Sequence, residues 1–281
     1  MMEIDNYQSY MIVFSKDNKR KTNFGKINNI LKKLRYFEAI DTLNYYEQWK
    51  TFSLKHNYAS EKYLNQEVEN NRLGFLKGKL GCNLSHQLLL EHISNNYYKN
   101  LKNKDNKDNK DNKDNKDNKD NKDNKDNKNN QQNDKWHLIL EDDLFISDKY
   151  TPVEIDLFLK NLINKINIIS PKTMYIQLCV YPQFQVNQNK TETIGSFEVN
   201  NQEFKIKKKL PQYGTCSYLI NKVAIKYLTD AVRPWGKNID FLYNSLDQPF
   251  NSVAIINPYF QCAGSVDAKD NRDTEFGSLI W

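Results

Sequence analysis

A long run without any apolar residue constrains this chain most. Residues 102–134 contain only Lys, Asn, Asp and Gln, and their centre is eight tandem Asp-Asn-Lys units from Asp105 to Lys128. Such a segment has nearly balanced charge and nothing to bury, so we predict that it is a disordered insertion. The calcium loops of helix–loop–helix proteins are also rich in Asp and Asn. They require a Gly at the sharp turn and a final Glu, however, and this segment has neither.

The two flanking segments predict one α/β domain over residues 1–281, interrupted by the insertion at 102–134. Apolar runs typical of strands alternate with helical patterns. The predicted strands are 10–15, 36–41, 137–140, 173–181, 215–220 and 252–257, and the predicted helices are 24–34, 83–97, 153–169 and 222–231. This alternation is typical of a mainly parallel, mixed sheet with helices on both faces. Asn83 is the expected N-cap of its helix, and Gly81 is expected in a turn before it.

Charge and cysteine content exclude several classes of protein. The net charge of +6 is spread out, and no basic helix, zinc-finger pattern or RNA-recognition signature accompanies it, so we expect no nucleic-acid partner. The four cysteines form no CxxC pair, and we expect reduced thiols. Neither a signal peptide nor a transmembrane segment is evident, which predicts a cytoplasmic protein. The Asn- and Lys-rich composition suggests an AT-rich genome, that of a microbial eukaryote or of a large DNA virus acting in such a host cell.

Three acids follow the apolar run 137–140 without a break: Glu141, Asp142 and Asp143. Two unit charges about 4 Å apart repel by roughly 4 kcal/mol at an effective dielectric near 20, so water or a cation must offset them. Ligands of open α/β sheets bind beyond the carboxyl ends of the strands. Strand alternation puts Glu141 and Asp143 on one side, where two carboxylates can hold a hard divalent ion. A solvated turn is the alternative.

Four motifs in order carry a resemblance to a known family. They are "GCNLSH" (81–86), "LEDD" (140–143), "GTCSYLI" (214–220) and "ID" (239–240). With the insertion removed, their order and spacing resemble glycosyltransferase family 25, which includes bacterial lipopolysaccharide glycosyltransferases and collagen hydroxylysine galactosyltransferases. Arg20 and "FEAID" (37–41) also match the family's opening pattern. The chain departs from it at Lys79, at Cys216–Ser217, and at Val266, which leaves any role of Asp267 open.

The resemblance implies a GT-A fold and a glycosyltransferase of the hexosyltransferase type. The implied donor is a nucleotide sugar, most simply a UDP-sugar, and the acceptor is a hydroxyl of a glycan or a hydroxylated protein. Transfer would invert the anomeric carbon and depend on Mn²⁺ or Mg²⁺. The implied residues are Glu141 and Asp143 for the metal, Asp142, Ser85, His86 and Arg20 for the donor, and Asp240 as general base.

Structural roles remain open for several of these residues. His86 either contacts the ligand or satisfies a core position, and Asp240 either activates the acceptor or caps the helix that follows. We expect Tyr218 to pack in the sheet and Cys82 to be a small buried residue. Two other functions stay open: a metal-dependent phosphohydrolase or nuclease using the same acids, and a non-catalytic glycan-binding relative. Manganese-dependent hydrolysis of a sugar nucleotide would separate the transferase from both.

Overall fold

The computed structural model describes residues 7–31, 33–69, 73–111, 136–180, 182–209, 215–230, 233–235 and 251–262. Ten strands and seven helices are present in these parts of the chain. The strands are β1 (Tyr7–Val13), β2 (Arg35–Glu38), β3 (Trp136–Glu141), β4 (Leu144–Phe145), β5 (Thr173–Gln177), β6 (Thr193–Val199), β7 (Gln202–Lys208), β8 (Ser217–Asn221), β9 (Asn251–Ile255) and β10 (Gln261–Cys262). The helices are α1 (Asn18–Ile30), α2 (Tyr46–Lys55), α3 (Glu61–Glu69), α4 (Leu73–Asp111), α5 (Pro152–Ile169), α6 (Pro182–Asn189) and α7 (Lys222–Asp230).

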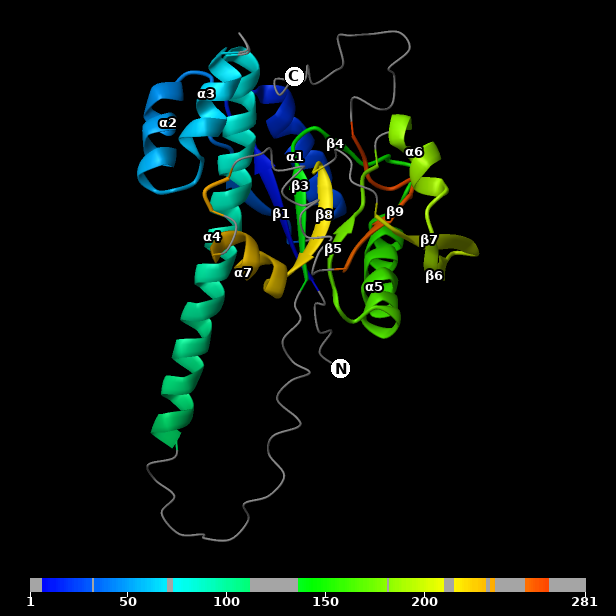
Figure 1. The fold of residues 1–281 in the computed structure, drawn as a ribbon. Helices are drawn as coiled ribbons and strands as arrows, with labels where there is room; N and C mark the ends of the chain where they lie inside the picture. The colour runs from blue at the N-terminus through cyan, green and yellow to red at the C-terminus, as the bar shows by residue number, and fades with distance from the viewer. Residues whose placement is uncertain are drawn as a thin grey trace.

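Eight of the strands form one mixed sheet in the order β2-β1-β3-β8-β5-β9-β7-β6 (Figure 1). The pairs β1–β2, β1–β3 and β5–β9 are parallel, whereas the other four neighbouring pairs are antiparallel. These pairings mean that β7 and β8 run antiparallel to the other six strands of the sheet. The predicted mixed α/β sheet is therefore confirmed, with β8 and β7 as its reversed members.

Helices cover both faces of the sheet because alternate residues of its central strands point to opposite sides. Leu138 and Leu140 of β3 belong to an apolar cluster that includes Ile27 of α1 and Phe158 of α5. Ile139, between them, belongs to a second cluster with residues of α4 and α7. Every residue of β3 is buried, which explains why Leu138, Ile139 and Leu140 are all apolar instead of alternating with polar residues. The predicted strand at 137–140 is confirmed.

The predicted start of the helix after Gly81 is wrong. Gly81 and Asn83 both lie inside α4, which begins at Leu73. The glycine serves a close approach: a Cβ built on Gly81 would come 2.5 Å from Thr42 Oγ1 and 2.9 Å from Ile40 O. Glycine is therefore required here by the loop after β2, and it marks no turn.

Helix α4 also continues to Asp111, into the region predicted to be disordered. Adding a residue to an existing helix costs far less than starting one, so a helix anchored by its buried turns can extend into polar sequence. Residues 112–134 lie outside the described parts of the chain, and their disorder stays a prediction. None of the helices in the described parts is both long and apolar enough to cross a membrane.

The expectation that all four cysteines are reduced thiols is wrong. Cys216 is disulfide-bonded, whereas Cys82 and Cys179 are thiols. Disulfides persist mainly in oxidising compartments. The bond of Cys216 therefore weakens the prediction, made from the sequence, that the protein lies in the reducing cytoplasm.

Candidate active site

A pocket lies at the carboxyl ends of β1 and β3, which are adjacent and parallel, with Ile12 paired to Glu141. Its volume is about 580 Å³ when the space open to solvent is included. The residues that matter chemically in its wall are Phe14, Arg20, Ser85, His86, Glu141 and Asp142. The structure thus brings five of the predicted site residues to one cavity, from α1, from α4, and from the end of β3 and the turn that follows it.

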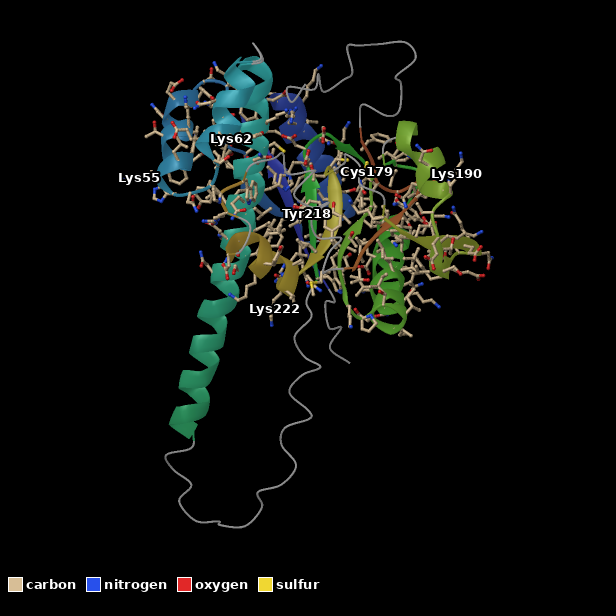
Figure 2. All side chains as sticks on the ribbon, in the orientation of Figure 1. Lys55, Lys62, Cys179, Lys190, Tyr218 and Lys222 are labelled. Carbon is tan, nitrogen blue, oxygen red and sulfur yellow. The ribbon has the colours of Figure 1, made fainter. Side chains whose placement is uncertain are left out.

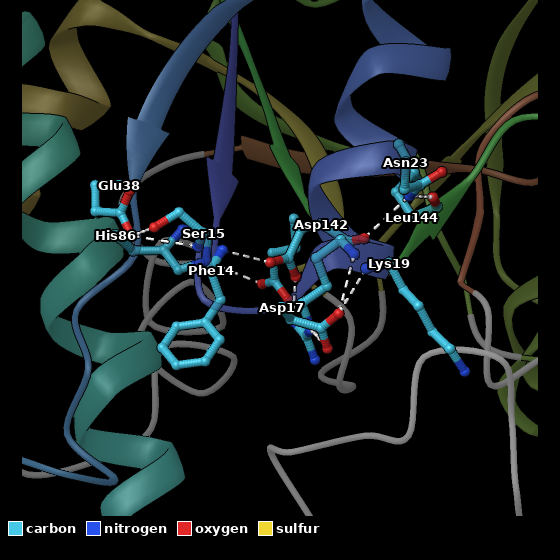
Figure 3. Close-up of polar contacts among 11 residues, drawn as sticks. Phe14, Ser15, Asp17, Lys19, Asn23, Glu38, His86, Asp142 and Leu144 are labelled. Atoms are coloured by element: carbon cyan, nitrogen blue, oxygen red, sulfur yellow. Dashed lines mark hydrogen bonds and ion pairs between the residues drawn. The ribbon is translucent and has the colours of Figure 1, made fainter.

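Asp142 faces the first turn of α1 (Figure 3). Its carboxylate accepts a hydrogen bond from the backbone N–H of Phe14 at 2.6 Å and forms an ion pair with Nη1 of Arg20. The amide of Asn23 donates to the backbone oxygens of Asp142 and Leu144, at 3.0 and 2.7 Å, and so fixes the turn after β3. Burial raises the pKa of Asp142 to about 6, although Arg20 opposes this. The Asp142 carboxylate is therefore fixed by contacts with Phe14 and Arg20.

Arg20 sits in the first turn of α1 because Asp17 caps that helix, with its carboxylate accepting from the backbone N–H groups of Lys19 and Arg20. The Arg20 side chain is buried, and its Nη2 has no hydrogen-bond partner among the described residues. Its Nε likewise has no hydrogen-bond partner there, and Asp17 Oδ2 lies 3.7 Å away. Figure 3 shows the neighbouring Lys19 extending away from Asp142. Arg20 therefore offers buried N–H groups to an anion in the pocket.

Glu141 points to the opposite side of β3 from Asp142, as strand alternation predicts, and contacts α4. Nε2 of His86 lies 2.9 Å from its Oε1, and the Thr215 hydroxyl donates to the same oxygen at 2.6 Å. Nδ1 of His86 lies 2.8 Å from the hydroxyl of Tyr218 on β8, at the centre of the molecule (Figure 2). Burial alone would raise the pKa of Glu141, but the bonds from His86 and Thr215 outweigh it and lower the pKa. Glu141 is thus held as a carboxylate.

Among the three acids, Asp143 has the fewest contacts that would stabilise a negative charge on its carboxylate. Its Oδ1 is buried and has no hydrogen-bond partner within the described residues. Burial first, and then the charges of Glu141 and Asp142, raise the pKa of Asp143 to about 8. A buried carboxylate oxygen of this kind, beside two further carboxylates, fits a hard divalent cation, which prefers oxygen ligands. The residues therefore suit the predicted metal, which stays a prediction.

Ser85 is one of the predicted donor-binding residues that line the pocket. It lies within α4, where its hydroxyl donates to Gly81 O at 2.6 Å and accepts from the backbone N–H of Ile40 at 2.8 Å. It therefore joins α4 to the segment after β2 in the pocket wall. Asn83, the predicted N-cap, lies in mid-helix with Ser85 and His86, so the backbone N–H groups of these residues are used within the helix and are not open to a ligand. Any donor contact of Ser85 stays a prediction.

Some predicted site residues cannot be placed, and some residues of the site were not predicted. Asp240, the expected general base, and Asp267 lie outside the described residues. Thr215 and Asn23 were not among the predicted site residues, and Tyr218 was predicted only to pack in the sheet. Tyr218 does pack there, between His86 and Tyr175, but its hydroxyl also belongs to the site. Thr215 had a usable signal, because it stands in the quoted "GTCSYLI" motif.

The sequence of this chain matches the model of one known protein family. Residues 127–243 match the model of glycosyltransferase family 25, described as an LPS biosynthesis protein. The match covers fewer than half of the 281 residues, and it shows that this part of the chain is similar to glycosyltransferase family 25. A search of curated proteins finds no match to the chain. The predicted family and the prediction of a glycosyltransferase are therefore confirmed.

The family 25 match contains the three acids, Thr215 and Tyr218, but it does not reach Arg20 or His86. The structure supplies that link. His86 bonds to Glu141 and Arg20 bonds to Asp142, so residues from outside the matched range complete the pocket of the matched domain.

Proposed function

We propose that this protein transfers a sugar from a nucleotide-sugar donor, a UDP-sugar, to a hydroxyl of a glycan or protein acceptor. The proposal includes a GT-A type domain, inversion at the anomeric carbon, and dependence on Mn²⁺ or Mg²⁺. The family 25 match supports transfer of a sugar, and it favours this over a phosphohydrolase, a nuclease or a non-catalytic glycan binder. The UDP-sugar donor and the inversion are what the family resemblance implies, whereas the chemistry of the pocket supports the anionic donor and the metal.

The single observation that carries the proposal is the pairing of buried acids with a buried arginine around one cavity. Arg20 uses Nη1 for Asp142 and keeps Nη2 for another acceptor. A guanidinium is a strong partner for phosphate oxygens because it donates several hydrogen bonds in a fixed plane. We infer that Arg20 contacts the diphosphate of the donor, while Asp142 positions Arg20.

The acids provide the second part of the site. Glu141 and Asp143 would hold the divalent cation. Such a cation acts as a Lewis acid and neutralises the negative charge that develops on a diphosphate leaving group. His86 and Thr215 orient Glu141 through its Oε1. The proposed base, Asp240, would accept the proton of the acceptor hydroxyl.

A thermal-shift screen of nucleotide sugars with Mn²⁺ tests the donor assignment. A ligand present at 100 times its Kd stabilises the folded state by about 2.7 kcal/mol, which gives a measurable rise in Tm. We expect UDP-sugars to raise the Tm of the wild-type protein. Arg20→Lys keeps a positive charge beside Asp142 but loses the planar donor group, so this shift should shrink. Lys19→Gln, which removes the adjacent exposed charge, is the matched control.

Each shift is measured against the Tm of the same variant without ligand, because Arg20 is buried and its replacement changes stability by itself. An equal UDP-sugar shift in Arg20→Lys and Lys19→Gln would exclude Arg20 from the donor site. If no nucleotide sugar shifts the wild-type Tm, with or without Mn²⁺, the donor class is wrong.

A further inference from the structure

Three side chains with different metal-binding atoms meet on the α4 side of the pocket. They are Cys82, His86 and Glu141, and their sulfur, nitrogen and oxygen ligand atoms all lie within 4.8 Å of one another. His86 and Glu141 are buried, whereas Cys82 is partly exposed. All three line the pocket, so a small cation has a path to them.

The local structure orients these groups toward one point. Cys82 and His86 are four residues apart in α4, which puts them on one face of the helix. Nδ1 of His86 is bonded to Tyr218, so the other ring nitrogen, Nε2, is the one that faces Glu141, at 2.9 Å. Metal-bound histidines are commonly held in this way, by a hydrogen bond to the nitrogen that does not bind the metal.

We propose that Cys82, His86 and Glu141 form a binding site for a thiolate-preferring divalent cation of the zinc class. Such ions take thiolate, imidazole and carboxylate ligands at about 2.0–2.3 Å in tetrahedral geometry, which places the ligand atoms about 3.5 Å apart. The three side chains need only small rotations to reach this spacing. A fourth position stays open toward the pocket. The site differs from the all-oxygen site of Glu141 and Asp143, which suits Mn²⁺ or Mg²⁺.

The two sites share Glu141, so one excludes the other. A zinc-class ion would draw Glu141 toward α4 and replace its hydrogen bond with His86. We therefore expect Zn²⁺ to inhibit sugar transfer at saturating Mn²⁺. This consequence for activity rests on the proposed function, whereas binding of the ion does not.

Cobalt substitution tests the site without any assay of activity. The full chain, freed of metal with a chelator, is titrated with Co²⁺ and its absorption spectrum is recorded. We expect the visible bands of tetrahedral Co²⁺ together with a near-ultraviolet band of thiolate-to-cobalt charge transfer. Cys82→Ser should lose the charge-transfer band, whereas Cys179→Ser, which removes the other cysteine known to be a thiol, should keep it. Tyr218→Phe should weaken Co²⁺ binding about 10–100-fold, as loss of an outer hydrogen bond typically does.

A second measurement needs no variant. In the wild-type protein, Zn²⁺ should protect Cys82 from alkylation by iodoacetamide, as peptide mass spectrometry would show. A wild-type cobalt spectrum without the thiolate band overturns the proposal, as does a band that survives in Cys82→Ser. Alkylation of Cys82 at the same rate with and without Zn²⁺ also overturns it. Any of these results with Mn²⁺-dependent transfer intact would leave the proposed function standing.

Discussion

Replacing Tyr218 by phenylalanine isolates one hydroxyl of the site. Tyr218 is fully buried, and its ring stacks against His86 at 5.8 Å and against Tyr175 at 5.3 Å between ring centroids. Its hydroxyl lies 2.8 Å from His86 Nδ1. Phenylalanine keeps the ring and both stacking contacts, so the change removes the hydroxyl and its hydrogen bond to His86.

The expected magnitude follows from burial of the bond. Removing one partner of a buried hydrogen bond costs about 1–3 kcal/mol of folding free energy, because the remaining polar atom has already lost its water. The same bond orients His86, which in turn holds Glu141 through Nε2. Loss of a hydrogen bond outside the metal ligands typically lowers activity about 10–100-fold, and we expect Tyr218→Phe to reduce the transfer rate in this range.

Urea denaturation and the rate of UDP release measure the two effects separately. Tyr7→Phe is the control, because it removes another tyrosine hydroxyl, which donates to Asp156 at 2.8 Å on the α5 side of the sheet, at the end of β1 remote from the pocket. That variant should lose stability but transfer sugar at the wild-type rate. If Tyr218→Phe behaves in the same way, the hydroxyl of Tyr218 only stabilises the fold, and its role in positioning Glu141 is refuted.

Three further predictions concern the helix cap, the base and the insertion. Thr151→Ala removes the capping box that joins Thr151 to Glu154 at the start of α5 and should lower the free energy of unfolding by about 1 kcal/mol, measured in urea, with transfer unchanged; an unchanged urea midpoint would contradict it. Asp240→Asn should lower turnover by about 10²-fold or more with donor affinity unchanged; loss of donor binding would instead place Asp240 in the donor site. Replacing residues 112–134 by a short Gly/Ser linker should preserve Tm and transfer rate, because one repeated tripeptide offers no specific register for contacts; a tenfold fall in rate at constant Tm would show that this segment takes part.

The strand before the acids and the placement of the acids were predictable from sequence. Leu138, Ile139 and Leu140 are apolar without alternation, which indicates a strand buried on both faces, and the carboxyl end of such a strand is where ligands bind. The opposite orientation of Glu141 and Asp142 followed from the period of two. These features are local, so local patterns are sufficient to find them.

The direction of β8 could not be read from its sequence. All five of its residues are buried, and a strand buried on both faces has the same composition whichever way it runs. Its antiparallel place between β3 and β5 depends on the connections, and these leave no residue pattern. The β6–β7 hairpin, in contrast, had an overlooked signal: Asn200 and Asn201 both have positive φ, as the tight turns of hairpins require.

The contacts that complete the site join distant segments. His86 and Glu141 are 55 residues apart, and Arg20 and Asp142 are 122 apart. The periodicity of apolar residues describes one helix or strand at a time, so it cannot predict contacts between distant segments. From the sequence, only the family resemblance indicated that these residues share a site. The false helix start at Asn83 has a local cause: Gly81 and Asn83 resemble a turn and a cap, whereas Gly81 is needed for its approach to Thr42.

Metal dependence of the transfer rate in matched aspartate variants tests the central claim most directly. UDP release from the donor and acceptor is followed for the wild type, for Asp143→Asn and for Asp148→Asn, which removes a nearby exposed carboxylate. Each is assayed with Mn²⁺ and with a chelator. We predict that Asp143→Asn with Mn²⁺ and the chelated wild type both fall to background, while Asp148→Asn with Mn²⁺ matches the wild type. Transfer by Asp143→Asn at the wild-type rate without added metal would contradict the account.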